Sequence, residues 1–159
     1  MFSVGDLVVH PMHGAGIIDD IVQEKIAGIV KDYYVFKMPM GGLVLKIPTA
    51  NSRAIGIRGI ISDEEVESLL AAIPQLDVES SANWNKRYQE NLVRLKSGNL
   101  YEVARVVKAL MQRDLQRGLS TGERKMLHNA KQIMVSELVL AGRRDYAETE
   151  VLLDQAMLQ

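Results

Sequence analysis

The spacing of apolar residues changes near residue 60, and this change constrains the fold more than any other feature of the sequence. Up to about Arg58, apolar residues come in short runs that are separated by glycines and turn-forming residues. Runs of this kind are typical of short β-strands. From Ser62 onward, apolar residues recur every three or four positions, as in amphipathic helices. The sequence therefore predicts an α+β protein with two domains, residues 1–58 and 59–159.

The N-terminal part predicts five short strands and the turns between them. Turns are indicated by Pro11–Gly14, by a hairpin tip at Ala27-Gly28 and by a longer hairpin loop at Pro39–Gly42. Five strands in so short a segment cannot form a two-sheet sandwich of ordinary size. We therefore expect a small, strongly bent barrel of the SH3-like or Tudor-like type. The expected strands lie near residues 7–9, 16–18, 33–36, 43–45 and 54–57.

The C-terminal part predicts a compact all-α domain of about five helices. Capping pairs mark three helix starts, because Ser62, Asn99 and Ser120 each precede a glutamate by three positions. Glycines mark several of the helix ends. On the helix that starts near Leu100, we expect Lys108 to point away from the apolar stripe and into solvent. The expected helices span residues 63–73, 82–96, 100–117, 121–141 and 146–157.

Composition and motifs argue against an enzyme. The chain has no cysteine, which excludes disulfides, thiolate metal sites and cysteine nucleophiles. His10 and His13 form a His-x-x-His pair, but no third ligand is nearby in the sequence, so we expect no metal site. The chain carries no nucleotide-binding fingerprint and no nucleophile with a recognisable base. We expect a protein without enzymatic activity and without a cofactor.

The sequence also predicts a cytoplasmic protein with no membrane association. The N-terminus lacks a basic segment followed by a long apolar stretch. No apolar run approaches the length of about 18 residues that a membrane-spanning helix needs.

Positive charge is concentrated in the middle of the helical part. Residues 84–131 contain eleven Lys and Arg against four Asp and Glu, whereas the whole chain has a net charge of -1. A localised basic segment can contact the phosphates of a nucleic acid over a short footprint. A solvated helical surface with internal ion pairs would have the same composition. Candidate phosphate contacts in this segment include Arg124, Lys125 and Lys131.

The single tryptophan, Trp84, lies at a predicted helix start within the polar segment Ser81–Tyr88. Lys86 and Arg87 follow it closely. At such a place an indole could stack on an unpaired base or enter a minor groove, while the two cations contact phosphates. The indole could instead cap the helical core. The residues alone leave both interpretations open.

Four segments of the chain form a specific pattern when they are taken together in order. They are Phe2-x-Val-Gly-Asp-x-Val-Val9-x-Pro-x-His-Gly14, Val44-x-Lys-Ile-Pro48 before Gly56-Ile-Arg58, Asn83-Trp-x-x-Arg-Tyr88-x-x-Asn91, and Arg113-Asp-x-x-x-Gly-Leu-Ser120-x-Gly-Glu-x-x-Met-Leu127. With these segments the chain resembles the CarD (CdnL) family of bacterial transcription regulators. The N-terminal pieces are unspecific alone, but their order together with the Asn-Trp and Gly-Leu-Ser-x-Gly-Glu segments is specific. The resemblance covers nearly the whole chain.

This resemblance implies that a Tudor-like domain docks on the β subunit of RNA polymerase and that the helical domain contacts promoter DNA. The residue matching Trp84 would stand in the minor groove at the upstream fork of the transcription bubble, where it hinders reannealing and prolongs the open complex. Lys86 and Arg87 would face the DNA backbone. On the polymerase side, the resemblance points to Lys46, and we add Lys25 and Val44 as neighbouring candidates. It also implies association with the nucleoid through polymerase.

A second hypothesis from another functional class stays open at this point. The chain could be a protein–protein adaptor in which a strand edge binds one partner and the helical domain binds another, without DNA contact. Trp84 would then be an interface hot spot. We expect a monomer, and a dimer formed by strand exchange is the alternative. A regulator that prolongs open complexes can activate or repress, depending on the promoter.

Overall fold

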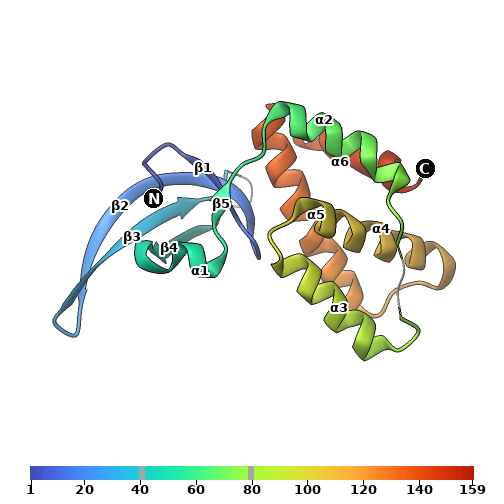
Figure 1. Ribbon diagram of the computed structural model, residues 1–159, viewed down its shortest axis with the longest axis horizontal. Coiled ribbons are helices and arrows are strands. Elements are labelled where there is room, and N and C mark those ends of the chain that lie inside the picture. Colours follow the sequence, from blue (N-terminus) through green and yellow to red (C-terminus); the bar gives the residue numbers. More distant parts are fainter. Residues whose placement is uncertain (40–41, 79–80) are drawn as a thin grey trace.

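A computed structural model describes residues 1–39, 42–78 and 81–159 and has the predicted α+β class. The N-terminal part is a sheet, called here the sheet unit, and the remainder is helical, called here the helical unit (Figure 1). A short 3-10 helix, Thr49–Asn51, and the one-turn helix α1, Ser52–Ile55, follow the fourth strand. The five strands are β1 (Leu7–His10), β2 (Gly14–Ile26), β3 (Ile29–Lys37), β4 (Val44–Pro48) and β5 (Arg58–Gly59).

The five strands form one antiparallel sheet in the order β4-β3-β2-β1-β5. The predicted hairpin tip at Ala27-Gly28 is confirmed, because Ile26 and Ile29 pair across it and both tip residues have positive φ. This hairpin extends as a long curved arm away from the helical unit (Figure 1). The predicted loop at Pro39–Gly42 falls partly outside the described residues.

The predicted closed barrel is wrong, because the sheet remains open. The edge strands β4 and β5 do not pair with each other, and β5 has only two residues to offer. The strand expected at Ala54–Ile57 is also wrong. Residues 52–55 form α1, and Gly56 ends it in the left-handed conformation at φ 99°. A three-residue apolar run cannot by itself distinguish a strand from one helical turn closed by glycine.

One face of the sheet carries the core of the sheet unit. The β2–β3 register bulges between Ile18 and Asp20, which lets the strands curl over this core. Its buried residues are Val8, Ile18, Tyr34, Phe36, Met38, Ile47 and Ile57.

The helical unit contains five α-helices among the described residues, as the sequence predicts. Ser62 and Ser120 accept the expected backbone hydrogen bonds from Glu65 and Glu123, while Asn99 caps through Tyr101 N. A second 3-10 helix, Ile73–Gln75, follows the first of these α-helices. The helices are α2 (Asp63–Ala72), α3 (Trp84–Lys96), α4 (Leu100–Arg117), α5 (Thr121–Gly142) and α6 (Tyr146–Met157). None of the described helices is long and apolar enough to cross a membrane.

The prediction that Lys108 faces solvent is wrong. The residue is only 3% exposed, and its ammonium group donates to the carbonyl oxygens of Ile73, Pro74 and Leu76 at 2.8, 3.0 and 2.9 Å. These carbonyls lie at the end of α2 and in the 3-10 turn that follows, where the regular helical hydrogen bonds stop, although Ile73 O also accepts one of 3.1 Å from Leu76 N. The long lysine stem therefore crosses the apolar surface of α4 to satisfy them.

The two units are joined by a polar contact that we call the junction clamp. Glu137 in α5 is completely buried and accepts two hydrogen bonds of 2.7 Å from the Arg58 guanidinium, plus one of 3.1 Å from Ile61 N. Beside it, Ser136 Oγ accepts a hydrogen bond of 2.9 Å from Ala15 N. A Cβ atom on Gly14 would lie 2.4 Å from this oxygen. The sheet therefore contacts α5 directly through backbone that needs a glycine.

Candidate nucleic-acid interface

Trp84 is the first residue of α3, and 42% of it is exposed. Its ring stacks on Tyr88, one helical turn later, with centroids 5.0 Å apart and an angle of 14° between the planes. Its indole N–H donates to Ser120 Oγ at 3.1 Å. Of the two interpretations of Trp84, exposure at the helix start therefore describes the structure better than burial in the core.

The start of α5 forms the surface on which the indole rests. A Cβ atom on Gly122 would lie 3.6 Å from Trp84 Cζ2 and 3.9 Å from Tyr88 Cε2, so the backbone of α5 passes close to both rings. Tyr88 in turn packs on the buried core of the helical unit. The indole therefore packs against α5 and Tyr88, and the rest of it is exposed.

A buried ion pair lies directly beneath this surface. Arg87 is 2% exposed, and its Nε donates to Glu123 Oε2 at 2.9 Å, with a longer bond of 3.4 Å from Nη2 to Oε1. Arg87 Nη1 also donates to the carbonyl oxygens of Ser81 and Ala82, at 3.0 and 3.3 Å. Arg113 approaches the same carboxylate at 3.9 Å.

The charge state of this pair follows from its surroundings. Burial alone raises the pKa of Glu123, but the hydrogen bonds and positive charges of Arg87, with help from Arg113 and Ser120, outweigh it and lower the pKa below its ordinary value. Glu123 is therefore ionised at neutral pH, and the pair is a true carboxylate–guanidinium contact.

This geometry differs from the expectation that Arg87 faces the DNA backbone. Arg87 lies three residues after Trp84, and that offset turns its side chain toward α5, where the Glu123 carboxylate holds it. Its guanidinium is not available to a phosphate in this arrangement. The sequence offered no signal of this pairing, because Glu123 stands three residues after Ser120, where a capping glutamate is ordinary.

The other predicted DNA-binding cations differ in their exposure and in whether they form ion pairs. Lys86 and Arg124 are exposed, and Arg124 lies 3.9 Å from Asp114. Lys125 is exposed on the same first turns of α5. Lys131 is partly buried, and its ammonium group forms an ion pair with Asp154 Oδ1 of α6 at 2.9 Å. Within residues 1–39, 42–78 and 81–159, Lys86 and Lys125 form no ion pair.

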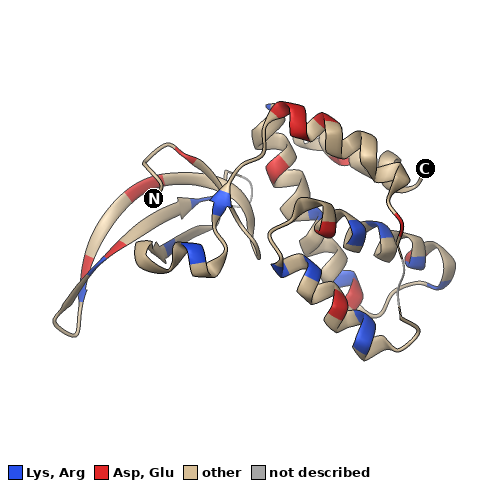
Figure 2. Cartoon of the chain, viewed as in Figure 1, with Lys and Arg blue, Asp and Glu red and all other residues tan. Residues whose placement is uncertain are grey.

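Figure 2 shows that Lys and Arg residues are spread over α3, α4 and α5. Several of them are paired with acidic neighbours, including Arg94 and Arg105 with Glu102. The cations that remain available beside Trp84 are therefore far fewer than the composition of the segment suggests. The structure brings together Trp84, Lys86, Arg124 and Lys125, and we call this set the indole surface.

The predicted polymerase-binding residues lie on the sheet unit, remote in sequence from the indole surface. Val44 and Lys46 are exposed on β4, and Lys46 pairs with Glu24 across the sheet. Lys25 is exposed near the end of β2, opposite Val30. The structure therefore places all three on exposed positions of the curved β2–β3–β4 layer.

The sequence analysis missed an apolar group at the tip of the β2–β3 arm. Ile26, Ile29 and Val30 flank the hairpin turn and are more than half exposed. The sequence signal for this group was the presence of apolar residues on both sides of the predicted tight turn. Exposed apolar side chains gathered at one place mark an interaction surface more often than a defect.

The His10–His13 pair has no metal-site geometry. The ring centroids are 4.6 Å apart, and His10 Nδ1 accepts a hydrogen bond of 3.0 Å from Met12 N. Burial, together with the nearby His13, lowers the pKa of His10 to about 4. Among the described residues no group of three His, Asp or Glu side chains could hold a metal ion.

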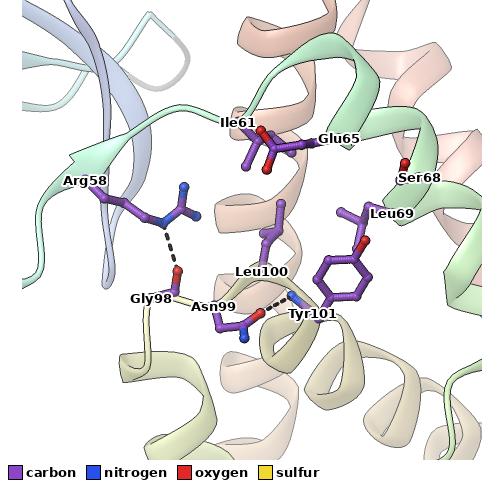
Figure 3. Close-up of a pocket in the computed structure, with 9 residues that line it drawn as sticks. All are labelled: Arg58, Ile61, Glu65, Ser68, Leu69, Gly98, Asn99, Leu100 and Tyr101. Atoms are coloured by element: carbon purple, nitrogen blue, oxygen red, sulfur yellow. Dashed lines mark hydrogen bonds between the residues drawn. The ribbon is translucent and has the colours of Figure 1, made fainter.

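A cavity of about 260 Å³ lies beside the junction clamp (Figure 3). Its polar groups serve the fold, since Arg58 Nε donates to Gly98 O at 2.8 Å and Asn99 Oδ1 accepts from Tyr101 N at 2.9 Å. No described nucleophile–base pair lines it. Its walls are Arg58, Ile61, Glu65, Ser68, Leu69, Gly98, Asn99, Leu100 and Tyr101.

Comparison with known proteins gives matches over most of the chain. Residues 2–61 match the family model described as "CarD-like/TRCF RID domain", and residues 68–154 match "CarD, C-terminal domain". The chain is similar to the "Putative transcription factor YdeB" of Bacillus subtilis (strain 168), with 33% identity over 138 residues that cover 87% of this chain and 90% of the relative. None of these matches is to an enzyme, in agreement with the prediction. The chain therefore belongs to the CarD family.

Proposed function

We propose that the protein is a transcription regulator that joins RNA polymerase to promoter DNA. Support comes from the two family matches and from the relative described as a transcription factor. In this proposal residues 1–58 form the polymerase-binding domain and residues 59–159 the DNA-contacting domain. The observation that carries the proposal is Trp84, an indole that is 42% exposed, with its N–H already bonded to the cap of α5 and with the exposed cations Lys86 and Lys125 on the first turns of the same two helices.

On the DNA side, the indole contacts the upstream fork of the bubble, and the cations contact phosphates. Lys86, Arg124 and Lys125 lie beside the indole and can provide such contacts without reading sequence. Lys131 contributes a phosphate contact only if its bond to Asp154 opens. Arg87 supports the indole from within and makes no direct contact in the free protein.

The size of the effect expected from one indole suits a protein that changes the lifetime of the open complex. Stacking of one aromatic side chain on a base contributes about 1–3 kcal/mol. Losing this contribution should speed bubble collapse by about 5- to 150-fold. The few free cations of the indole surface would bind free DNA weakly and in a salt-dependent manner. Binding to polymerase then supplies the local concentration that DNA contact needs.

On the polymerase side, the β2–β3–β4 layer docks on the β subunit. Lys46, Lys25 and Val44 are exposed there. The arm tip adds exposed apolar surface that the β subunit would bury on binding. The protein acts as a monomer in the cytoplasm, at the nucleoid through its polymerase contact.

The decisive experiment compares Trp84→Ala with Tyr101→Ala. Tyr101 is a matched control, because it lies at the start of α4 and is 40% exposed. We expect Trp84→Ala to shorten the lifetime of polymerase–promoter open complexes by 5-fold or more, as estimated above. Polymerase binding measured in the absence of promoter should stay unchanged, and Tyr101→Ala should preserve both. Equal lifetimes for wild type and Trp84→Ala would exclude the proposal.

A protein–protein adaptor without DNA contact is the second candidate. It is favoured by the apolar side chains Val151 and Leu152, which are exposed on α6. Crosslinking of polymerase-bound protein to promoter DNA separates the two. Crosslinks through the indole surface that weaken steeply with ionic strength support DNA contact. Complexes that form equally with and without DNA support the adaptor.

A further inference from the structure

The indole of Trp84 is fixed by a residue from another helix. Ser120, the N-cap of α5, accepts the indole N–H although the two residues are 36 positions apart. Trp84 itself stands in the first turn of α3, where the backbone has the fewest hydrogen bonds to hold it. Contact with the cap of α5 therefore determines how the ring is oriented more than the frame of α3 does.

The two serine caps, Ser62 and Ser120, differ in how the glutamate three residues later is bonded. At Ser62, the glutamate three residues later accepts a hydrogen bond from the N–H of the serine itself, which completes a reciprocal capping box. At Ser120, the equivalent Glu123 does not close the box. Its carboxylate still accepts from Ser120 Oγ at 3.3 Å, but its other hydrogen bonds come from Arg87 of α3 and not from Ser120 N. The cap of α5 thus lacks the hydrogen bond from Ser120 N to Glu123, and Glu123 instead contacts Arg87 of α3.

Arg87 extends this contact to the segment before α3. It holds the carbonyl oxygens of Ser81 and Ala82, the residues that lead into the helix. The indole is consequently fixed on two sides, by Ser120 at its nitrogen and by a clamped backbone at its helix entry. A buried ion pair contributes little net stability compared with apolar packing, so its more plausible contribution is geometric.

We infer that Ser120, Glu123 and Arg87 are positioning residues that orient the Trp84 indole before DNA is met. This inference rests on the proposed function and assigns these three residues a task within it. Ordering a side chain in advance removes that entropic cost from the binding step. The network therefore sets how much of the possible stacking free energy is realised at the fork.

The test uses Ser120→Ala, Glu123→Gln and Ser120→Thr in the full chain. Since Trp84 is the single tryptophan, its fluorescence anisotropy decay and its quenching by acrylamide report on this ring alone. We expect Ser120→Ala and Glu123→Gln to increase indole mobility and quenching. Both should shorten open-complex lifetime by about 5-fold, the loss of one net hydrogen bond. Ser120→Thr retains a hydroxyl and should restore both properties.

The matched control is Ser62→Ala, which removes the same kind of cap from α2 without touching the indole. It should lower stability by a similar amount and leave fluorescence and lifetime as in the wild type. In a Trp84→Phe background, which has no ring N–H, Ser120→Ala should have no further effect on lifetime.

Unchanged indole mobility in Ser120→Ala and Glu123→Gln would overturn the inference. A change of equal size in Ser62→Ala would overturn it as well, because the effect would then be one of general stability. If Trp84→Ala itself leaves open-complex lifetime unchanged, the proposed function fails. The orientation of the indole is judged separately, by fluorescence without DNA.

Discussion

The ammonium group of Lys108 shows how much of this fold depends on single polar atoms. Among the described residues it is buried with no carboxylate partner, and three carbonyl oxygens share its hydrogen bonds. Lys108→Met keeps a comparable apolar stem but removes all three of these hydrogen bonds, so we expect a loss of about 2–4 kcal/mol in the free energy of unfolding. Urea denaturation measures it. The exposed Lys96→Met should change stability by less than about 0.5 kcal/mol.

His10 gives the stability a pH dependence with a definite sign. Its pKa is about 4 in the folded protein and 6.5 in the unfolded chain. Between these values the unfolded chain binds the extra proton, so the stability contributed by His10 is lost as the pH falls from 6.5 toward 4. We expect the urea midpoint of the wild type to fall between pH 7.5 and pH 5 by more than that of His10→Gln. An equal fall in both proteins would contradict this.

Arg87 and Lys108 explain why residue-level predictions failed where element-level ones succeeded. On a helical wheel each looks like a surface cation. The partners that bury them, Glu123 and the carbonyls after α2, lie more than 30 positions away in sequence. Local patterns carry no information about such partners. Trp84 was placed correctly because its polar, helix-start neighbourhood is itself a local signal.

At the scale of elements, the helices could be predicted almost to the residue, whereas the strands could not. Side-chain caps at Ser62, Asn99 and Ser120 mark helix starts through bonds within four residues. Strand pairing depends on distant segments, and the β2–β3 arm proved much longer than its apolar runs. Alternation of polar and exposed apolar residues hid the outer half of this arm.

The arm tip supports a prediction about partner binding. Ile29 is 59% exposed, so Ile29→Lys should leave the free energy of unfolding within about 0.5 kcal/mol of the wild type. If the arm docks on polymerase, the new charge should weaken that binding by about 5-fold or more, as for a contact worth over 1 kcal/mol. Titration of polymerase with labelled protein measures the affinity. Val93→Lys, at an exposed position of α3, is the matched control and should bind normally.

At the scale of the whole molecule, the junction clamp connects the sheet unit to α5 through hydrogen bonds to a buried carboxylate, and we expect it to couple the motion of the two units. Glu137→Gln removes the charge that Arg58 and Ile61 N share, and we expect a loss of about 2–4 kcal/mol, below the full effect of a buried pair because Arg58 is partly exposed. NMR relaxation should give one rotational correlation time for both units in the wild type and two in the variant. Glu67→Gln, which removes an exposed pair with Arg144, should change neither quantity appreciably.

One correlation time in Glu137→Gln would mean that the remaining contacts, including the hydrogen bond from Ala15 N to Ser136 Oγ, are enough to join the units. Either result bears on function, because the arm and the indole surface belong to different units. A regulator that bridges two large partners benefits from a fixed distance between its two contact points, since a loose connection would dilute one contact relative to the other.

The junction also depends on the absence of a side chain at Gly14. Gly14 approaches Ser136 so closely that a methyl group in its place would collide with the hydroxyl, at 2.4 Å. Any larger residue at position 14 would push the sheet away from α5 and tilt it. The arm and Trp84 would each keep their own structure, yet, under the proposed function, they would no longer contact polymerase and DNA at the same time. A substitution at position 14 would therefore change the relative orientation of the sheet unit and the helical unit without changing the arm or the indole surface.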